Sequence, residues 1–214
     1  MGRLAVVGGN ATAGLDLAGA DWLTLDRHGE EYTLPDRIDH ASNMRRLLDE
    51  GCDRVLAICS VGGLQPQLGP GTFVCPDDFI ALDTSLTTLE GLEAHRVPGF
   101  DSRWRERVLE AWAGTAQTPL IDGGVYWHAL GPRLETPAEI RLIARDADVI
   151  GMTMASECVV AGELGLAYAA ICAVVNYANG VGEEPLTMAE IEEGASAMRS
   201  TLGDALAALL PELA

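Results

Sequence analysis

The stretch ADVIGMTMASECVVAGELGLAYAAICAVVN, residues 147–176, decides the fold class of this chain. Residues 147–153 and 167–176 are short apolar runs typical of buried strands. Between them, residues 156–165 have the composition of a helix, with Ser156 as the predicted N-cap. A strand, a helix and a strand in succession are typical of an α/β protein.

Strands and helices continue to alternate outside this stretch. Thr136-Pro137-Ala138-Glu139 has an N-cap residue, a proline at the first helical position and a glutamate at the third, and Thr187 is a second predicted cap. The sequence predicts one α/β domain over residues 1–214, a layered fold with a central mixed, largely parallel sheet flanked by helices. The further predicted strands are residues 3–9, 53–60, 72–82 and 119–126, the further helices are residues 41–50, 102–112, 187–210 and one from about 136, and residues 83–99 are the longest expected loop.

Composition excludes several classes of protein. With 214 residues and 48% hydrophobic content, the chain can bury one sizeable core. No apolar run reaches the roughly 18 residues that a membrane span needs, and the first residues do not resemble a secretory signal. We therefore expect a cytoplasmic protein with no membrane partner. The five cysteines form no CxxC pair, so neither a disulfide framework nor a metal site is expected.

The net charge of −18 argues against nucleic acid as a partner, because an acidic surface repels the phosphate backbone. A local contact can still bind an anion, since two unit charges about 4 Å apart interact by about 4 kcal/mol at an effective dielectric constant of 20. The Arg27-His28-Gly29 segment is a candidate anion clamp, and a solvated charge pair is the alternative.

Small and polar residues follow several predicted strands: Gly8-Gly9-Asn10, the segment from Ser60, Thr153 and Asn176. In α/β sheets, ligands bind outside the carboxyl ends of the strands, so these residues are expected to converge. The Gly8-Gly9 pair fits neither the dinucleotide fingerprint nor the P-loop, so no nicotinamide or ATP cofactor is indicated, and a simple turn is the alternative.

Five segments in order resemble the trimeric purine nucleoside phosphorylase and methylthioadenosine phosphorylase family, closest to its methylthioinosine phosphorylase-like members. The combination of GPR-x-ET-PAE, GMT and NY is the specific part of this resemblance, which covers most of the chain. The segments are RHG at residues 27–29, ICSVGGLQPQLGPGTFVCPDDFI at 58–80, GGVYWHALGPRLETPAEIR at 123–141, ADVIGMTMASE at 147–157 and YAAICAVVNYANG at 168–180.

The resemblance implies reversible phosphorolysis, in which inorganic phosphate displaces a purine from C1′ of a nucleoside and leaves a sugar 1-phosphate. It implies a homotrimer and no cofactor besides the phosphate co-substrate. Asn176, Arg27 and His28 are implied to be catalytic. By resemblance, phosphate contacts Arg27, His28 and Thr153, and in the glycine-rich loop it contacts Thr12 or, as a substitute, Asn10. The ribose and C5′ group contact Met152, Met188 and Ser60. The purine contacts Asn176, Glu135, Leu134 and Gly62.

Two side chains favour a 6-oxopurine. Family members that take adenine typically carry Asp at the position of Asn176, and the Glu135 carboxylate can accept from N1–H, which adenine lacks. An amide can also pair with adenine, Asn176 can be a strand-end cap, and Glu135 can be a helix N-terminal carboxylate, so these alternatives stay open. Leu134 stands where the family usually has a stacking Phe.

The apolar Met188 suits a methylthio group at C5′, and Met152 is implied to lie against the ribose; for both, a core position is the alternative. We expect a 5′-methylthioinosine phosphorylase. The alternatives are an inosine/guanosine or methylthioadenosine phosphorylase, or a non-catalytic nucleoside-binding homologue.

Overall fold

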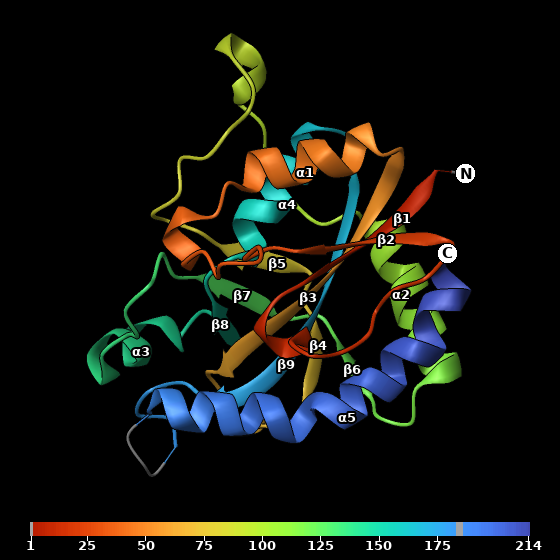
Figure 1. The fold of residues 1–214 in the computed structure, drawn as a ribbon. Helices are drawn as coiled ribbons and strands as arrows, with labels where there is room; N and C mark the ends of the chain where they lie inside the picture. Colours follow the sequence, from red (N-terminus) through yellow and green to blue (C-terminus); the bar gives the residue numbers. More distant parts are fainter. Residues whose placement is uncertain (1, 183–185) are drawn as a thin grey trace.

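Two long neighbouring strands form the centre of the molecule, which is described for residues 2–182 and 186–214 by a computed structural model (Figure 1). β3 (Cys52–Gly63) and β9 (Ala167–Tyr177) run parallel, and both are buried along most of their length. The other strands are β1 (Arg3–Gly8), β2 (Trp22–Asp26), β4 (Phe73–Cys75), β5 (Asp78–Ile80), β6 (Leu120–Asp122), β7 (Val125–His128) and β8 (Val149–Gly151).

The sheet is mixed and largely parallel, as predicted. Its strand order is β5-β7-β8-β3-β9-β4-β6, with β1 also on β3 and β2 on the outside of β1. Only the β3–β8 and β4–β9 ladders are antiparallel among the strands of the described residues. The helices are α1 (His40–Asp49), α2 (Ser102–Thr115), α3 (Pro137–Ile143), α4 (Met154–Glu163) and α5 (Met188–Leu213).

Helices cover both faces of this sheet (Figure 1). Residues of β3 alternate between the faces: Val55 and Ala57 pack in the core beneath α1 and α4, whereas Leu56 and Ile58 pack beneath α2 and α5. Because side chains of a strand point to opposite faces in turn, a strand buried on both sides is apolar throughout. This arrangement confirms the predicted α/β layered fold.

One edge of β3 is shared by two strands and is interrupted between them. β1 pairs with β3 as far as Val7 and Ala57, whereas β8 pairs only with Gly62 and Gly63. Residues 58–61 of β3 therefore have no strand neighbour on this edge in the described part of the chain. The sheet opens at this point.

Local sequence signals explain several element boundaries. Thr136 and Thr187 are the N-caps of α3 and α5, as predicted, and both form capping boxes. The predicted cap at Ser156 is wrong: α4 begins two residues earlier, with Thr153 as its N-cap. Ser156 instead lies inside the helix, with its Oγ 3.3 Å from Nε2 of His128.

Two features of the sheet differ from the expectation. The strand predicted over residues 119–126 is split into β6 and β7, because Gly123 and Gly124 have φ of 92° and 118°. β2 was not predicted, since it is a short, partly exposed strand with little alternation. The expected loop over residues 83–99 contains only one short 3-10 turn, η3 (Gly91–Ala94).

In the described ranges, no group of three or more His, Cys, Asp or Glu side chains is placed to hold a metal ion. The five cysteines are free and buried. No helix of the described residues has the length and apolar character needed to cross a membrane.

Candidate active site

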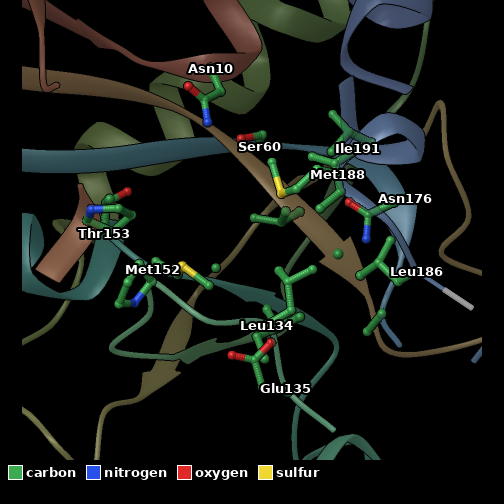
Figure 2. Close-up of a pocket in the computed structure, with 18 of the residues that line it drawn as sticks. Asn10, Ser60, Leu134, Glu135, Met152, Thr153, Asn176, Leu186, Met188 and Ile191 are labelled. Carbon is green, nitrogen blue, oxygen red and sulfur yellow. The ribbon is translucent and has the colours of Figure 1, made fainter. Parts of the chain in front are cut away.

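A cavity of about 290 Å³ lies beside the open edge of β3, at the carboxyl ends of the central strands. In Figure 2, Asn10 lies above the cavity, Thr153 to its left, Asn176 to its right and Glu135 below it. The residues predicted from the sequence that line it are Asn10, Arg27, His28, Ser60, Gly62, Leu134, Glu135, Met152, Thr153, Asn176 and Met188. These residues come from seven separate parts of the chain, which only the fold brings together.

Arg27 fills the interruption in the sheet. Its Nη1 donates to the carbonyl oxygen of Ile58 at 2.8 Å, and its Nη2 donates to that of Val7 at 3.3 Å. Both are carbonyls of the strands that part at this point. A Cβ on Gly9 would lie 2.7 Å from Nη1, so glycine is required for the guanidinium to reach the cavity. Because Arg27 is buried, the alternative interpretation of this segment as a solvated charge pair is wrong.

The guanidinium fork faces a carboxylate instead of the cavity. Nε and Nη2 of Arg27 donate to Oε1 and Oε2 of Glu157 at 2.7 and 3.2 Å, and the Tyr168 hydroxyl donates to Oε2 at 2.9 Å. The sequence-based prediction that the whole fork would grip phosphate is therefore corrected. Among the described residues, the second hydrogen of Nη1 is the one guanidinium hydrogen without a protein acceptor, so it is the one that a ligand can accept.

Both members of this ion pair are charged. Burial by itself would lower the pKa of Arg27, but the neighbouring Glu157 carboxylate reverses that effect and raises it. Burial would likewise raise the pKa of Glu157, and the guanidinium together with its hydrogen bonds lowers it below the usual range. Arg27 thus keeps its positive charge in a buried position.

His28 and Thr153 complete this end of the cavity, which we call the cationic end (Asn10, Arg27, His28 and Thr153). Nδ1 of His28 lies 2.8 Å from the carbonyl oxygen of Thr33 and so carries a hydrogen, because a carbonyl can only accept. Thr153 is the N-cap of α4, yet its hydroxyl makes no capping bond. A helix N-terminus with a free hydroxyl favours an anion.

Thr12 does not line the cavity, in contrast to its predicted role. Its Oγ1 accepts from the backbone N–H of Gly9 and donates to the carbonyl oxygen of Gly9, both at 3.0 Å. The hydroxyl is therefore engaged within its own turn. Asn10, named as the substitute, does line the cavity, and its Nδ2 donates to the Tyr32 hydroxyl at 3.2 Å.

The other end of the cavity, which we call the amide end, is formed by Gly62, Glu135, Asn176 and Asn179. Nδ2 of Asn176 donates to the carbonyl oxygen of Tyr177 at 2.7 Å, and a Cβ on Gly62 would lie 3.2 Å from this nitrogen. Burial raises the pKa of Glu135. Asn179 donates to the backbone of Glu135 at 2.9 Å and so links the two sides of this end.

An apolar wall joins the two ends. Met152 is partly buried and packs against the small core that contains Ile150, while it also lines the cavity. Met188 has 57% of its surface exposed, so the alternative of a core methionine does not hold. Ile191 lies beside Met188, and Leu186 lies beside Asn176 (Figure 2).

Sequence reasoning did not identify several of these residues. Glu157 had a detectable signal, because a carboxylate within the apolar run MASECVV requires a buried partner. Tyr32, Asn179, Leu186 and Ile191 had none, because they reach the cavity only through loop and helix placement.

The fold and cavity define an α/β protein with one cavity that has a cationic end and an amide end. The family model described as "Phosphorylase superfamily" matches residues 23–211. This chain belongs to the phosphorylase superfamily.

Individual relatives cover most of the chain. A probable 6-oxopurine nucleoside phosphorylase from Archaeoglobus fulgidus is 38% identical over 188 residues, which is 86% of this chain and 77% of that protein. A probable S-methyl-5′-thioinosine phosphorylase from Xanthomonas campestris is 36% identical over 195 residues, 86% of this chain and 78% of that protein. Among solved structures, methylthioadenosine phosphorylase from Schistosoma mansoni in complex with adenine superimposes on this chain with a TM-score of 0.79 and 22% sequence identity. The match covers 96% of this chain and 91% of that protein's chain. This similarity supports the fold alone.

Proposed function

We propose that this protein is a purine nucleoside phosphorylase that converts a 6-oxopurine nucleoside and inorganic phosphate to the free base and a pentose 1-phosphate. The observation that carries the proposal is that the cationic end and the amide end line one and the same cavity. Relatives that cover most of the chain are named as phosphorylases of 6-oxopurine nucleosides or of S-methyl-5′-thioinosine, which supports the same reaction.

The chemistry follows from the charges at the two ends. A phosphate oxygen forms a bond to C1′ while the C1′–N9 bond breaks, and the bonding electron pair leaves with the purine. Arg27, His28 and Thr153 hold the incoming phosphate, and the N-terminus of α4 adds the favourable end of its dipole. Asn176 donates to N7 of the departing purine, where negative charge develops. The purine anion then takes up a proton.

The preference for a 6-oxopurine rests on the amide end. Hypoxanthine and guanine carry a hydrogen on N1, and the Glu135 carboxylate can accept it, whereas adenine N1 would meet the carboxylate with a lone pair. The Glu135 carboxyl lies on the cavity wall and is partly buried. In this environment a mismatched base leaves a desolvated carboxylate without a donor, which costs about 1–3 kcal/mol.

The C5′ substituent is proposed to be a methylthio group, so that the substrate is 5′-methylthioinosine. Met152, Leu186, Met188 and Ile191 line the cavity with apolar side chains, and the Ser60 hydroxyl beside Met188 is proposed to contact the ribose. An apolar wall favours a thioether over a hydroxyl, because the hydroxyl would lose hydrogen bonds to water.

The remaining properties are part of the same proposal. The chain acts as one nucleoside phosphorylase-like domain over residues 1–214, in a cytoplasmic homotrimer, with phosphate as co-substrate and no cofactor. A sizing column coupled to light scattering tests the trimer.

The activity is tested by incubating the protein with 5′-methylthioinosine, inosine, guanosine and 5′-methylthioadenosine, with and without phosphate, and measuring free base by chromatography. Phosphate-dependent release, fastest from 5′-methylthioinosine, is expected. Release without phosphate indicates a hydrolase. No release, together with retained nucleoside binding, indicates a non-catalytic homologue.

A further inference from the structure

Tyr32 has an unusual backbone conformation at the edge of the cavity. Its φ is 49°, and it is the only non-glycine residue with positive φ in the described ranges. A bulky side chain in this left-handed region is strained, and such strain persists only where neighbouring contacts enforce it. The contacts that enforce it here lie at the cationic end.

Two contacts hold the tyrosine side chain. Its ring stacks on the imidazole of His28, with centroids 4.6 Å apart and an interplanar angle of 12°. Its hydroxyl accepts from Nδ2 of Asn10 at 3.2 Å. Tyr32 therefore bridges the turn after β2 and the loop after β1, and it lines the cavity between them.

The direction of the hydrogen bond with Asn10 leaves the phenolic hydrogen free. Because the amide nitrogen can only donate, the Tyr32 oxygen is the acceptor, and no second partner of this hydroxyl is present in residues 2–182 or 186–214. The hydroxyl of Thr12, in contrast, is engaged with Gly9 on both its donor and its acceptor side.

We infer that the Tyr32 hydroxyl donates to an oxygen of the bound phosphate, and that it supplies the donor first assigned to Thr12. This inference rests on the proposed function, because it names a further contact to the proposed co-substrate. Asn10 is then a positioning residue, which orients the phenol by donating to its oxygen. The stacked His28 fixes the ring plane.

The test compares Tyr32→Phe with the wild type in steady-state kinetics over a range of phosphate concentrations. Phenylalanine keeps the ring that stacks on His28 and removes only the hydroxyl. The KM for phosphate is expected to rise about tenfold or more, the loss typical of one hydrogen bond to a charged group, while the KM for the nucleoside changes less than about twofold. Tyr177→Phe is the matched control, since that hydroxyl donates to the carbonyl oxygen of Pro66 outside the cavity.

Calorimetric titration of inorganic phosphate into both proteins separates this inference from the proposed function. If the wild type requires phosphate for base release but Tyr32→Phe keeps its phosphate KM, the inference is overturned and the phosphorylase stands. If the wild type binds phosphate without base release, the proposed function fails, and the phosphate affinity of Tyr32→Phe still decides the inference: a loss of about tenfold supports it and equal affinity overturns it. If the wild type binds no phosphate, both are overturned.

Discussion

Arg27 and Glu157 form a buried bidentate ion pair, with Nε 2.7 Å from Oε1 and Nη2 3.2 Å from Oε2, although 130 residues separate them in the sequence. Arg27 lines the cavity, whereas its partner Glu157 is fully buried and also accepts from the Tyr168 hydroxyl. The ion pair orients the guanidinium so that Nη2 donates to the carbonyl oxygen of Val7 in β1, while Nη1 donates to that of Ile58 in β3 and also lies next to Gly9. The pair therefore serves both the fold and the proposed phosphate site.

Removing the Glu157 carboxylate tests how far the ion pair stabilises the fold. Glu157→Ala leaves a buried guanidinium without its counter-charge, so the free energy of unfolding is expected to fall by about 3–5 kcal/mol, measured by urea denaturation. Arg133→Ala, which breaks the exposed pair with Glu139 and leaves the capping box of Thr136 intact, is the control and is expected to leave the urea midpoint nearly unchanged. Equal stability of Glu157→Ala and the wild type would contradict the role of the pair.

Gly9→Ala should affect phosphate binding specifically. The new Cβ would lie 2.7 Å from Nη1 of Arg27 and 3.3 Å from Cδ2 of His28, so both side chains must move. We expect the KM for phosphate to rise about tenfold, equivalent to about 1.4 kcal/mol. Gly114→Ala in α2 is the control, because its Cβ would meet nothing within 4 Å. An unchanged phosphate KM in Gly9→Ala would argue against the cationic end as the phosphate site.

Asn176→Asp should change which base is accepted. A carboxylate accepts from the 6-amino group of adenine but repels the 6-oxo group of hypoxanthine. The ratio of kcat/KM for 6-oxopurine over 6-aminopurine nucleosides is expected to fall by about tenfold or more, in line with about 1–3 kcal/mol per polar pair. The measurement is a substrate competition followed by chromatography. If the variant keeps the wild-type ranking, Asn176 does not select the base.

Met188→Ser should reduce the preference for a methylthio group at C5′. The side chain is 57% exposed, so stability is expected to change little. Loss of the apolar contact is expected to lower the ratio of kcat/KM for 5′-methylthioinosine over inosine about tenfold, within the range of about 1–3 kcal/mol for a small apolar group. Met188→Leu keeps the apolar surface and serves as control. A similar drop in both variants would show that shape, not polarity, matters here.

Acid should destabilise the protein through His128. Burial lowers the pKa of His128 to about 4, well below the 6.5 of a free histidine, and its neighbours are Ser156, His40 and Asp83. The unfolded chain binds a proton at higher pH than the native state does, so this contribution to stability is complete above about pH 6.5 and is lost as pH falls toward 4. The loss from this group is about 3 kcal/mol.

Urea denaturation at pH 7 and pH 4.5 measures this effect. His128→Gln is expected to lose less stability between the two pH values than the wild type does. His95→Gln, at an exposed histidine, is the matched control. It is expected to lose as much stability between the two pH values as the wild type does. An equal pH dependence in all three proteins would assign the acid sensitivity to other groups.

Elements with strong local signals could be predicted from the sequence. The capping boxes at Thr136 and Thr187 fixed two helix starts, because the cap and the third helical residue bond reciprocally. β3 and β9 were evident because strands buried on both faces are apolar throughout. β2 was missed because its burial comes from pairing with β1, which the sequence does not encode locally.

The residues of the candidate site could likewise be predicted only in part. Of the site residues that the family resemblance named, the structure brings all except Thr12 to one cavity. The assignment of Thr12 failed because a hydroxyl three residues from Gly9 can bond within its own turn. The sequence shows that the carboxylate of Glu157 needs a buried partner, but it does not identify Arg27 as that partner, since a contact across 130 residues leaves no periodic signal.

The interrupted edge of β3 also bears on how relatives of this chain should be judged. Arg27 replaces a missing backbone neighbour by bonding to the carbonyl oxygens of Val7 and Ile58. A relative that has lost turnover would still need this arginine for architectural reasons. Its presence in a genome-derived sequence is therefore poor proof of activity, and the polar residues on the far wall, Glu135 and Asn176, are the better diagnostic.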